Sequence, residues 1–262
     1  MNGRLGWIDD IKRTAPTISW LGSLGALAAS LCLPVPAMAQ DSDGFTWSVT
    51  PYLWASRTEV DLSYRGDSIG GDEISFDDLL GVLDSAFMIH AEGGRGYWSG
   101  YLDLTYLETS DREERTLFTI DTDSEQVILD AAVAWWPGGA GSALSLIGGL
   151  RYTGFDDRYH FILQSTEVAT RRNTADYYDA LLGIRYRFDL SERWALATHA
   201  DASFGDSEGT WVLRAMFAYT VGKRQQNRIL FGYQYKQAEF RDGDLDTDFS
   251  YYGPIAGFDF RF

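Results

Sequence analysis

Cysteine is almost absent from this chain of 262 residues, because Cys32 is the only one. A single thiol can form no disulfide within the chain and no cluster of thiolate ligands around a metal, so neither crosslink stabilises the fold. Basic residues are also scarce: 22 Lys and Arg stand against 38 Asp and Glu, which gives a net charge of −16. This excess of acid argues against nucleic acid as a partner, since phosphate binding needs clustered Lys and Arg.

Long apolar runs are missing as well, apart from one near the amino terminus. Residues 18–33 are apolar, follow two basic residues, and precede an Ala-Met-Ala sequence at 37–39. The run is shorter than the roughly 18 to 20 residues that cross a bilayer, and the small-x-small sequence is a signal peptidase site. We therefore expect residues 1–39 to be a cleaved signal peptide for export through the inner membrane, and residues 40–262 to form one mature domain.

The rest of the chain alternates between apolar and polar residues. Trp98, Leu102 and Leu104, for example, would face one side of a strand, with Asp103 and Thr105 on the other. Ten such segments follow Phe45, each about ten residues long, which is the length of a tilted membrane strand. A chain without transmembrane helices can span a membrane only as a closed β-barrel. The sequence therefore predicts an all-β, closed antiparallel transmembrane barrel of about ten strands in the outer membrane of a Gram-negative cell.

Other strand counts fit the same pattern. Residues 58–65 and 155–163 also have strand character, so eight or twelve strands remain open, with these segments as external hairpin extensions. A soluble sandwich would alternate too, but the apolar faces here carry Trp or Tyr at their ends, as expected for girdles at two lipid interfaces. Short connections, expected in the periplasm, lie at 93–96, 137–141, 189–193 and 221–226. Long acidic connections, expected outside the cell, lie at 56–84, 109–125, 154–176 and 239–247.

The carboxyl-terminal residues resemble the recognition strand that outer-membrane barrels present to their assembly machinery. Gly257, Phe260 and the terminal Phe262 fall where that pattern places them, whereas Ile255 replaces its usual polar residue. The resemblance implies that these three matching residues form an assembly signal and that the barrel assembly machinery is a partner.

Three further stretches resemble an uncharacterised family of porin-like Gram-negative barrels. They are PYLW at 51–54, FDDLL at 76–80 ahead of LD at 83–84, and GP at 253–254. The resemblance covers nearly the whole mature chain. It implies an outer-membrane location and a barrel fold, and it transfers no catalytic residue.

The polar face of the predicted strands would line the lumen of the barrel. Its acids and bases nearly balance, which favours an ion-paired network that fills a narrow barrel and makes the protein a structural or permeability element. A narrow porin-like channel for small solutes is the other interpretation. The residues predicted to line the lumen are His90, Glu92, Asp103, Asp130, Arg151, Asp179, Arg185, Arg187, His199, Asp201, Arg214, Arg228, Lys236, Asp259 and Arg261.

The acidic connections raise the question of metal binding. Asp242, Asp244, Asp246 and Asp248 repeat at every second position, and carboxylates suit divalent cations such as Ca²⁺. The segment lacks the glycine and the distal glutamate of a dedicated calcium loop, so a solvated surface is the stronger interpretation. We expect no cofactor, and a monomer in contact with outer-membrane lipid and lipopolysaccharide.

An enzyme that hydrolyses or transfers acyl chains of lipid is the alternative function. His199, Asp201 and Ser203 are the residue types of a nucleophilic triad. Residues four apart on one strand face are about 13 Å apart, however, so they cannot form a self-contained triad. The sequence therefore predicts no catalytic residue and no enzyme activity.

Overall fold

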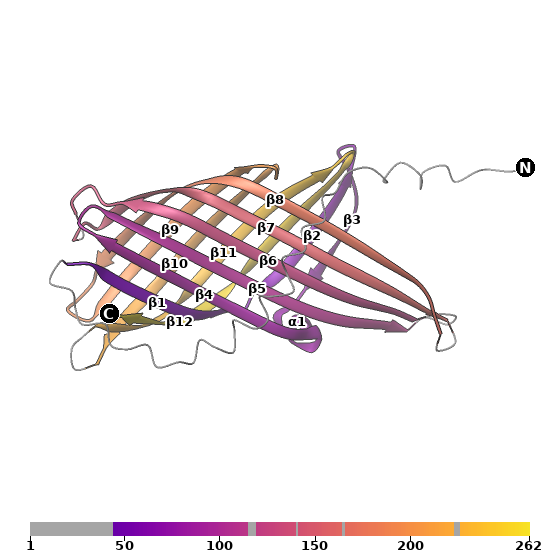
Figure 1. Ribbon diagram of the computed structural model, residues 1–262, viewed down its shortest axis with the longest axis horizontal. Coiled ribbons are helices and arrows are strands. Elements are labelled where there is room, and N and C mark those ends of the chain that lie inside the picture. Colours follow the sequence, from indigo (N-terminus) through magenta and orange to yellow (C-terminus); the bar gives the residue numbers. More distant parts are fainter. Residues whose placement is uncertain (1–43, 115–118, 140, 164–165, 223–225) are drawn as a thin grey trace, which may run out of the picture. The chain divides into compact units, whose positions relative to one another are not determined.

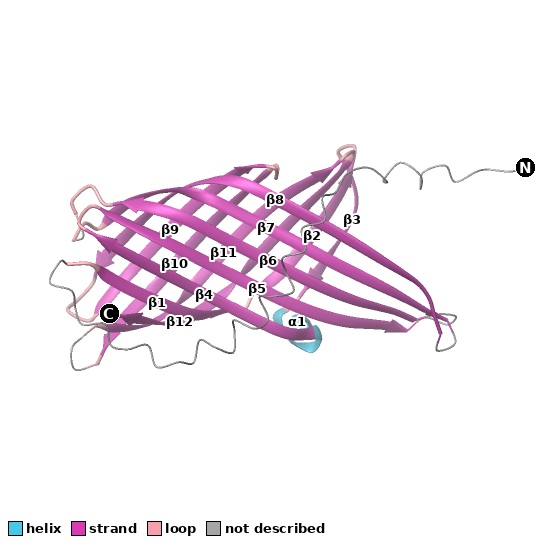
Figure 2. Ribbon diagram, viewed as in Figure 1, coloured by secondary structure: helices cyan, strands magenta, loops and turns pink. Residues whose placement is uncertain are grey.

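In the computed structural model, the residues described are 44–262 without 115–118, 140, 164–165 and 223–225. They form strands almost throughout, with one helix, α1 (Phe76–Val82) (Figure 1, Figure 2). No described helix has the length and apolar character to span a membrane. The expected signal peptide lies outside the described residues and stays a prediction. The strands are β1 (Thr46–Trp54), β2 (Arg57–Tyr64), β3 (Asp67–Ile74), β4 (Leu83–Arg95), β5 (Trp98–Glu114), β6 (Thr119–Trp135), β7 (Leu144–Leu163), β8 (Thr166–Asp189), β9 (Trp194–Gly205), β10 (Gly209–Val221), β11 (Asn227–Asp242) and β12 (Leu245–Arg261).

Ten of these strands close into a ring. The order is β1-β4-β5-β6-β7-β8-β9-β10-β11-β12, and β12 pairs again with β1, all antiparallel. At the closing pair, Trp47 and Phe262 exchange two backbone hydrogen bonds of 3.3 and 2.9 Å. The prediction of a closed antiparallel barrel with ten strands is confirmed.

The strands are longer than predicted on one side of the barrel. β7 has 20 residues and β8 has 24, so segments expected to be long loops are mostly strand. Charged and hydroxyl side chains hold these ladders together in water; Arg112, for example, donates to both oxygens of Asp121 at 2.7 and 2.6 Å. Where both faces of a strand are solvated, apolar and polar residues alternate only weakly. The predicted strand length of about ten residues is therefore too short for the external parts of these strands.

Hairpin extensions are confirmed at the two segments with extra strand character. Residues 57–64 form β2, which pairs with β3 and with the outer half of β12, and residues 155–163 form the outer end of β7. The opposite end carries the short turns and the carboxyl terminus (Figure 1). In an outer-membrane barrel the short turns are periplasmic, so the extensions lie on the external side.

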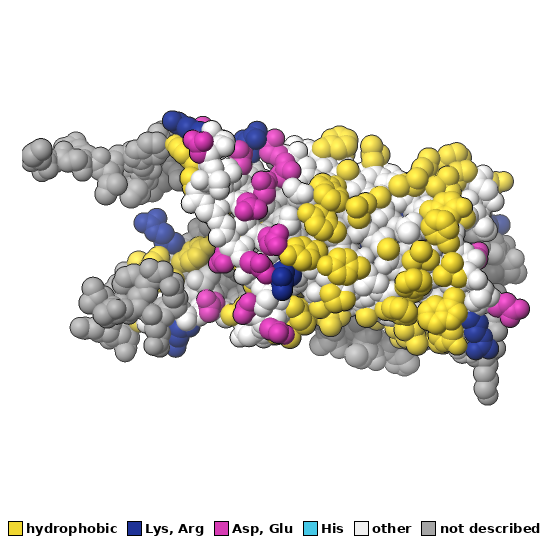
Figure 3. Space-filling model, turned by 180° about the vertical axis from the view of Figure 1, so that it is seen from behind, with side chains coloured by type: hydrophobic (Ala, Val, Ile, Leu, Met, Phe, Trp, Pro, Cys, Tyr) yellow, Lys and Arg dark blue, Asp and Glu magenta, His cyan; other side chains and the backbone are white. Residues whose placement is uncertain are grey.

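The outer wall is apolar over its middle. Leu102, Leu150 and Leu182 are more than half exposed, and Trp98 faces Trp135 across β5 and β6 near the periplasmic turns. Figure 3 shows this apolar belt, with acidic side chains gathered beyond it toward the external end. A continuous apolar belt of this kind is unfavourable in water and is typical of the lipid-facing surface of an outer-membrane β-barrel.

The wall bends where β1 passes into β2. Trp54 faces Ile255 and Arg57 faces Tyr252, so the register against β12 is unchanged across the interruption. The amide of Ser56 turns back to donate to the carbonyl of Trp54 at 3.0 Å. This bend presses the backbone onto Gly253, where an added Cβ would lie 2.0 Å from the carbonyl oxygen of Ala55. Only glycine fits this position without moving the backbone.

Replacing Gly253 with Ala is therefore expected to destabilise the barrel by about 1 to 3 kcal/mol, the usual cost of overpacking. Gly100→Ala is the control, because the nearest atom to its Cβ would be 3.9 Å away. Urea unfolding of both variants in lipid vesicles measures the difference. Equal stability of the two variants would show that the bend is not tightly packed.

Candidate functional site

Strand register brings the charged residues of the lumen together. His90, Asp103, Asp130, Arg151 and Asp179 are successive cross-strand partners from β4 to β8. A second row runs from β8 to β11 through Arg185, His199, Arg214 and Gln234. Since side chains on one face of a sheet share their direction, both rows point into the barrel.

Ion pairs join the two walls across the lumen. Glu92 on β4 accepts from Arg185 on β8 at 2.7 Å, and Arg214 on β10 lies 4.0 Å from Asp103 on β5. Along one wall, Arg151 on β7 reaches past β8 to Asp201 on β9 at 3.0 Å. We call these residues, with His90, Asp130 and His199, the ionic belt.

Arg151 is the most enclosed charge of the ionic belt. Its side chain is 3 % exposed, and it donates to both oxygens of Asp130 at 2.7 Å. Its Nη1 atom is buried with no hydrogen-bond partner among the described residues. Lys236 is also buried and lies within range of the charges of Arg151, Asp130 and Asp201.

Histidine and neutral polar residues complete the network. The Nδ1 atom of His90 lies 3.0 Å from Asp103, which also accepts from the hydroxyl of Tyr52 at 2.6 Å. The guanidinium of Arg185 stacks 4.5 Å from the ring centre of Tyr101. Tyr52 and Tyr101 are not among the predicted lumen residues; alternation puts both on the polar face, but neither carries the charge that marks the others.

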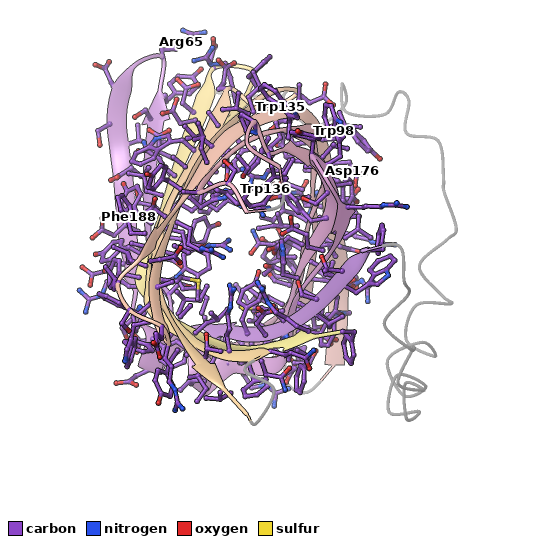
Figure 4. The ribbon with its side chains drawn as sticks, turned by 90° about the vertical axis from the view of Figure 1, so that its left-hand side faces the viewer. Arg65, Trp98, Trp135, Trp136, Asp176 and Phe188 are labelled. Carbon is purple, nitrogen blue, oxygen red and sulfur yellow. The ribbon has the colours of Figure 1, made fainter. Side chains whose placement is uncertain are left out.

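A cavity of about 660 Å³ lies between the ionic belt and the periplasmic end. Figure 4 looks into the barrel from that end, where Trp136 lies near the opening. We call this cavity the vestibule. Of the predicted lumen residues, it is lined by His90, Glu92, Asp103, Asp130, Arg185, Arg187, His199, Asp201, Arg214, Arg228, Asp259 and Arg261.

The other three predicted lumen residues, Arg151, Asp179 and Lys236, are buried. Asp179 lies at the inner end of the β9–β10 connection and accepts from the hydroxyls of Ser203 and Ser207 at 3.2 and 2.6 Å.

Aromatic residues gather on the lumen face in the external part of the barrel. Tyr177 and Phe240 have ring centres 4.5 Å apart, Phe155 lies 5.6 Å from Phe240, and Phe249 stacks on Tyr251 at 5.9 Å. We call these five residues the aromatic cluster. They lie on the same strand faces as the ionic belt, beyond it toward the outside. Sequence alternation did not mark these residues as lumen residues, because an apolar residue on a membrane strand is otherwise assigned to the lipid face.

The three residue types of a nucleophilic triad are separated by their hydrogen bonds. His199 contacts Asp201 at 2.5 Å, but the hydroxyl of Ser203 donates to Asp179. Ser203 is thus bonded away from His199, and the three residues do not form a Ser-His-Asp triad.

Two aspartates of the β11–β12 hairpin are held by arginines. Asp244 pairs with Arg65 at 2.9 Å, and Asp246 pairs with Arg241 across the hairpin. Within the described part of the chain, no three His, Cys, Asp or Glu side chains are arranged to hold a metal ion. The interpretation of these residues as a cation site therefore gains no support from their geometry.

Acidic side chains also form a row on the outer wall beyond the girdle. Glu125 lies between Glu108 and Asp156 on neighbouring strands. Partial burial and the carboxylates of Asp156 and Glu108 raise the pKa of Glu125. Because its pKa in the folded protein lies above the unfolded value, its charge opposes folding at neutral pH, and acidification through that pKa removes the penalty.

Glu125→Gln is expected to stabilise the barrel at pH 7 by about 0.2 to 1 kcal/mol, the size of a like-charge cross-strand pair. The gain should disappear below pH of about 4, where the carboxyl of an unfolded chain is also protonated. Thermal unfolding in detergent across this pH range measures it, with Glu192→Gln in the exposed β8–β9 turn as the control. A gain that does not change with pH would contradict the electrostatic cause.

Loss of Arg151 is expected to be far more costly. Arg151→Met leaves the largely buried Asp130 without its cation and Asp201 with His199 alone, and breaking a buried pair costs about 3 to 5 kcal/mol. Arg158→Met is the matched control, since Arg158 is 48 % exposed and pairs with Asp156 at the surface, where a pair contributes about 0 to 1 kcal/mol. Urea unfolding in vesicles distinguishes them. Similar small losses in both would mean that water fills the ionic belt.

Comparison with known proteins gives likenesses of fold only. The chain matches the attachment invasion locus protein Ail of Yersinia pestis at 10 % identity, with a TM-score of 0.37, over 83 % of this chain and 99 % of that one. It matches the outer membrane protease OmpT of Escherichia coli at 9 % identity and a TM-score of 0.42, over 84 % and 97 %. The outer membrane protein OprG of Pseudomonas aeruginosa matches at 11 % identity and a TM-score of 0.26, over 84 % and 96 %. Identities and scores this low transfer no activity.

No family model matches the chain, and no curated protein sequence does. The narrower resemblance to one porin-like family therefore stays a prediction. The fold shows that the chain is an outer-membrane β-barrel, without assigning it to one family.

Proposed function

We propose that this protein is a non-enzymatic outer-membrane barrel that does not conduct solutes: a structural and permeability element whose lumen is closed by ion pairs and aromatic rings. The observation that carries this proposal is the stacking of two barriers along one axis. The ionic belt crosses the lumen through Glu92–Arg185 and Asp103–Arg214, and the aromatic cluster lies beyond it.

The extent of the vestibule supports this reading. Its lining runs from Phe45 and Phe262 at the periplasmic end to Met216 and Ile255, and includes no member of the aromatic cluster. A narrow porin-like channel for small solutes is the second candidate, and the volume of the vestibule favours it. In that case water and salt would screen the same charges, which would then set ion selectivity.

The outer surface of the barrel suggests which parts of the membrane it contacts. The apolar belt would contact outer-membrane lipid, the external extensions would lie among lipopolysaccharide, and the chain would act as a monomer. The role of Gly257, Phe260 and Phe262 as an assembly signal stays a prediction. In the structure Phe260 and Phe262 are exposed on β12 and at the end of the chain, where the barrel closes on β1.

Conductance in a planar lipid bilayer tests the proposal. The wild-type protein is expected to give no steady current, whereas Phe240→Ala combined with Arg185→Ala, which thins both barriers, should open a measurable one. Phe231→Ala on the lipid-facing wall is the control and should stay silent. Steady current from the wild type would replace this proposal with the channel. Release of acyl chains from lipid vesicles by the pure protein would instead establish the enzyme.

A further inference from the structure

The barrel wall is interrupted on its external side between β1 and β4. The ladder of these two strands runs from Thr46–Gly94 to Pro51–Ile89 and ends there. Farther out, the strand that continues β1 is β2, and its neighbour is β3, beginning with the pair Thr58–Ile74. The partner on this side of the wall therefore changes from β4 to β3.

No described strand joins the two sides of this interruption. The first residues of β4, from Leu83 to Met88, pair only with β5, and β3 pairs only with β2. Helix α1 connects β3 to β4 in the chain, and none of its residues is buried. We call the gap in hydrogen bonding between β1–β3 and the outer half of β4 the seam.

The inner end of the seam lies at the external membrane interface. Leu53 and Phe87 would be the next facing pair on the lipid side if the β1–β4 ladder continued, and they are 55 % and 43 % exposed. Phe87 is the cross-strand partner of Tyr106, an aromatic residue of the outer girdle. The seam therefore begins where the outer leaflet meets its headgroups.

Directly behind the seam, the lumen is apolar. Trp54 and Met88 come from the two strands that diverge, and they are buried with Met216 and Ile255. We call these four residues the apolar cluster. Methionine side chains are flexible and fill irregular space, so a cluster with two of them can repack around a guest.

One polar atom in this apolar cluster has no partner. The side chain of Trp54 is 7 % exposed, and its Nε1 is buried without a hydrogen-bond acceptor in the described residues. Buried indole N–H groups are normally bonded, and an unmade bond is unfavourable. The unbonded donor indicates a ligand that brings its own acceptor.

We propose that the seam is a lateral portal through which a single-chain amphipathic molecule, such as a fatty acid, enters from the outer leaflet. Its carboxylate accepts a hydrogen bond from the indole of Trp54, and its hydrocarbon chain lies between Leu53 and Phe87 toward the lipid. This inference goes beyond a structural role and does not require a conducting lumen.

The apolar cluster also connects the seam to the vestibule. Met216 and Ile255 line the vestibule at the end away from the periplasm. Tyr52 and Arg214 also line this cavity. The nearest charges on this side of the lumen are the paired Arg214 and Asp103, the second of which accepts from Tyr52.

Binding of a fluorescent fatty acid, 11-(dansylamino)undecanoic acid, tests the portal in the full chain reconstituted in vesicles. Directly excited dansyl emission should rise saturably with the wild type. Trp54→Phe, which removes the N–H donor and part of the ring, should weaken binding about tenfold or more, the effect of one hydrogen bond to a charged group. Trp211→Phe on the lipid-facing wall should bind like the wild type. Absence of saturable binding, or equal affinity of the two variants, would overturn the proposal.

A crosslink across the seam tests the route. In a chain with Cys32→Ser, Leu53→Cys and Phe87→Cys can be joined by a disulfide or by a short bis-methanethiosulfonate linker. Joining them should slow probe entry at least tenfold, and reduction should restore it. The control pair, Val49→Cys with Ala91→Cys, lies in the paired part of the ladder and should have no effect when joined. Unchanged entry through a fully crosslinked seam would overturn the lateral route, whatever the conductance measurements show.

Discussion

Closure of the antiparallel ladder is the constraint on which the rest of this structure depends. In hydrocarbon, a backbone group that lacks a partner in the protein cannot form a hydrogen bond to water instead. The strands must therefore form a ring with no free edge. β12 supplies that closure by pairing with β1 from Ser48–Arg261 to Trp54–Ile255. Once the ring and its register are fixed, the period of two decides which side chains meet lipid and which enter the lumen.

The contents of the lumen follow from that register. A ten-stranded ring is narrow, so residues from opposite walls come within hydrogen-bonding distance, as Glu92 and Arg185 do at 2.7 Å. Buried charges need opposite charges or hydrogen bonds, and each arginine that crosses the lumen pairs with a carboxylate on the far wall. Farther out the same strand faces carry rings such as Tyr177 and Phe240, and there apolar packing fills the space in place of ion pairs.

The sequence predicted the ring and the polar face because alternation is a strong local signal. Arg185 between Ile184 and Tyr186 can be oriented without any knowledge of its neighbours. The aromatic cluster could not be predicted in this way, because Phe155 and Phe249 are apolar residues on the lumen face, and an apolar residue is otherwise assigned to lipid. β3 could not be predicted for a different reason. Every one of its residues is exposed, so it has no buried apolar face and no alternation marks it as a strand.

The position of the seam agrees with the constraint that closes the barrel. Unpaired backbone is unfavourable at the middle of the membrane but can be hydrated at its surface, and the β1–β4 ladder stops at Pro51, beside the outer girdle. Proline has no amide hydrogen to donate, and just beyond it the chain bends at Ser56 against Gly253. Two of the sequence motifs, PYLW at 51–54 and GP at 253–254, thus meet at the bend where β1 gives way to β2. Backbone groups left unpaired at this level can bond to water, and the lateral portal lies there for that physical reason.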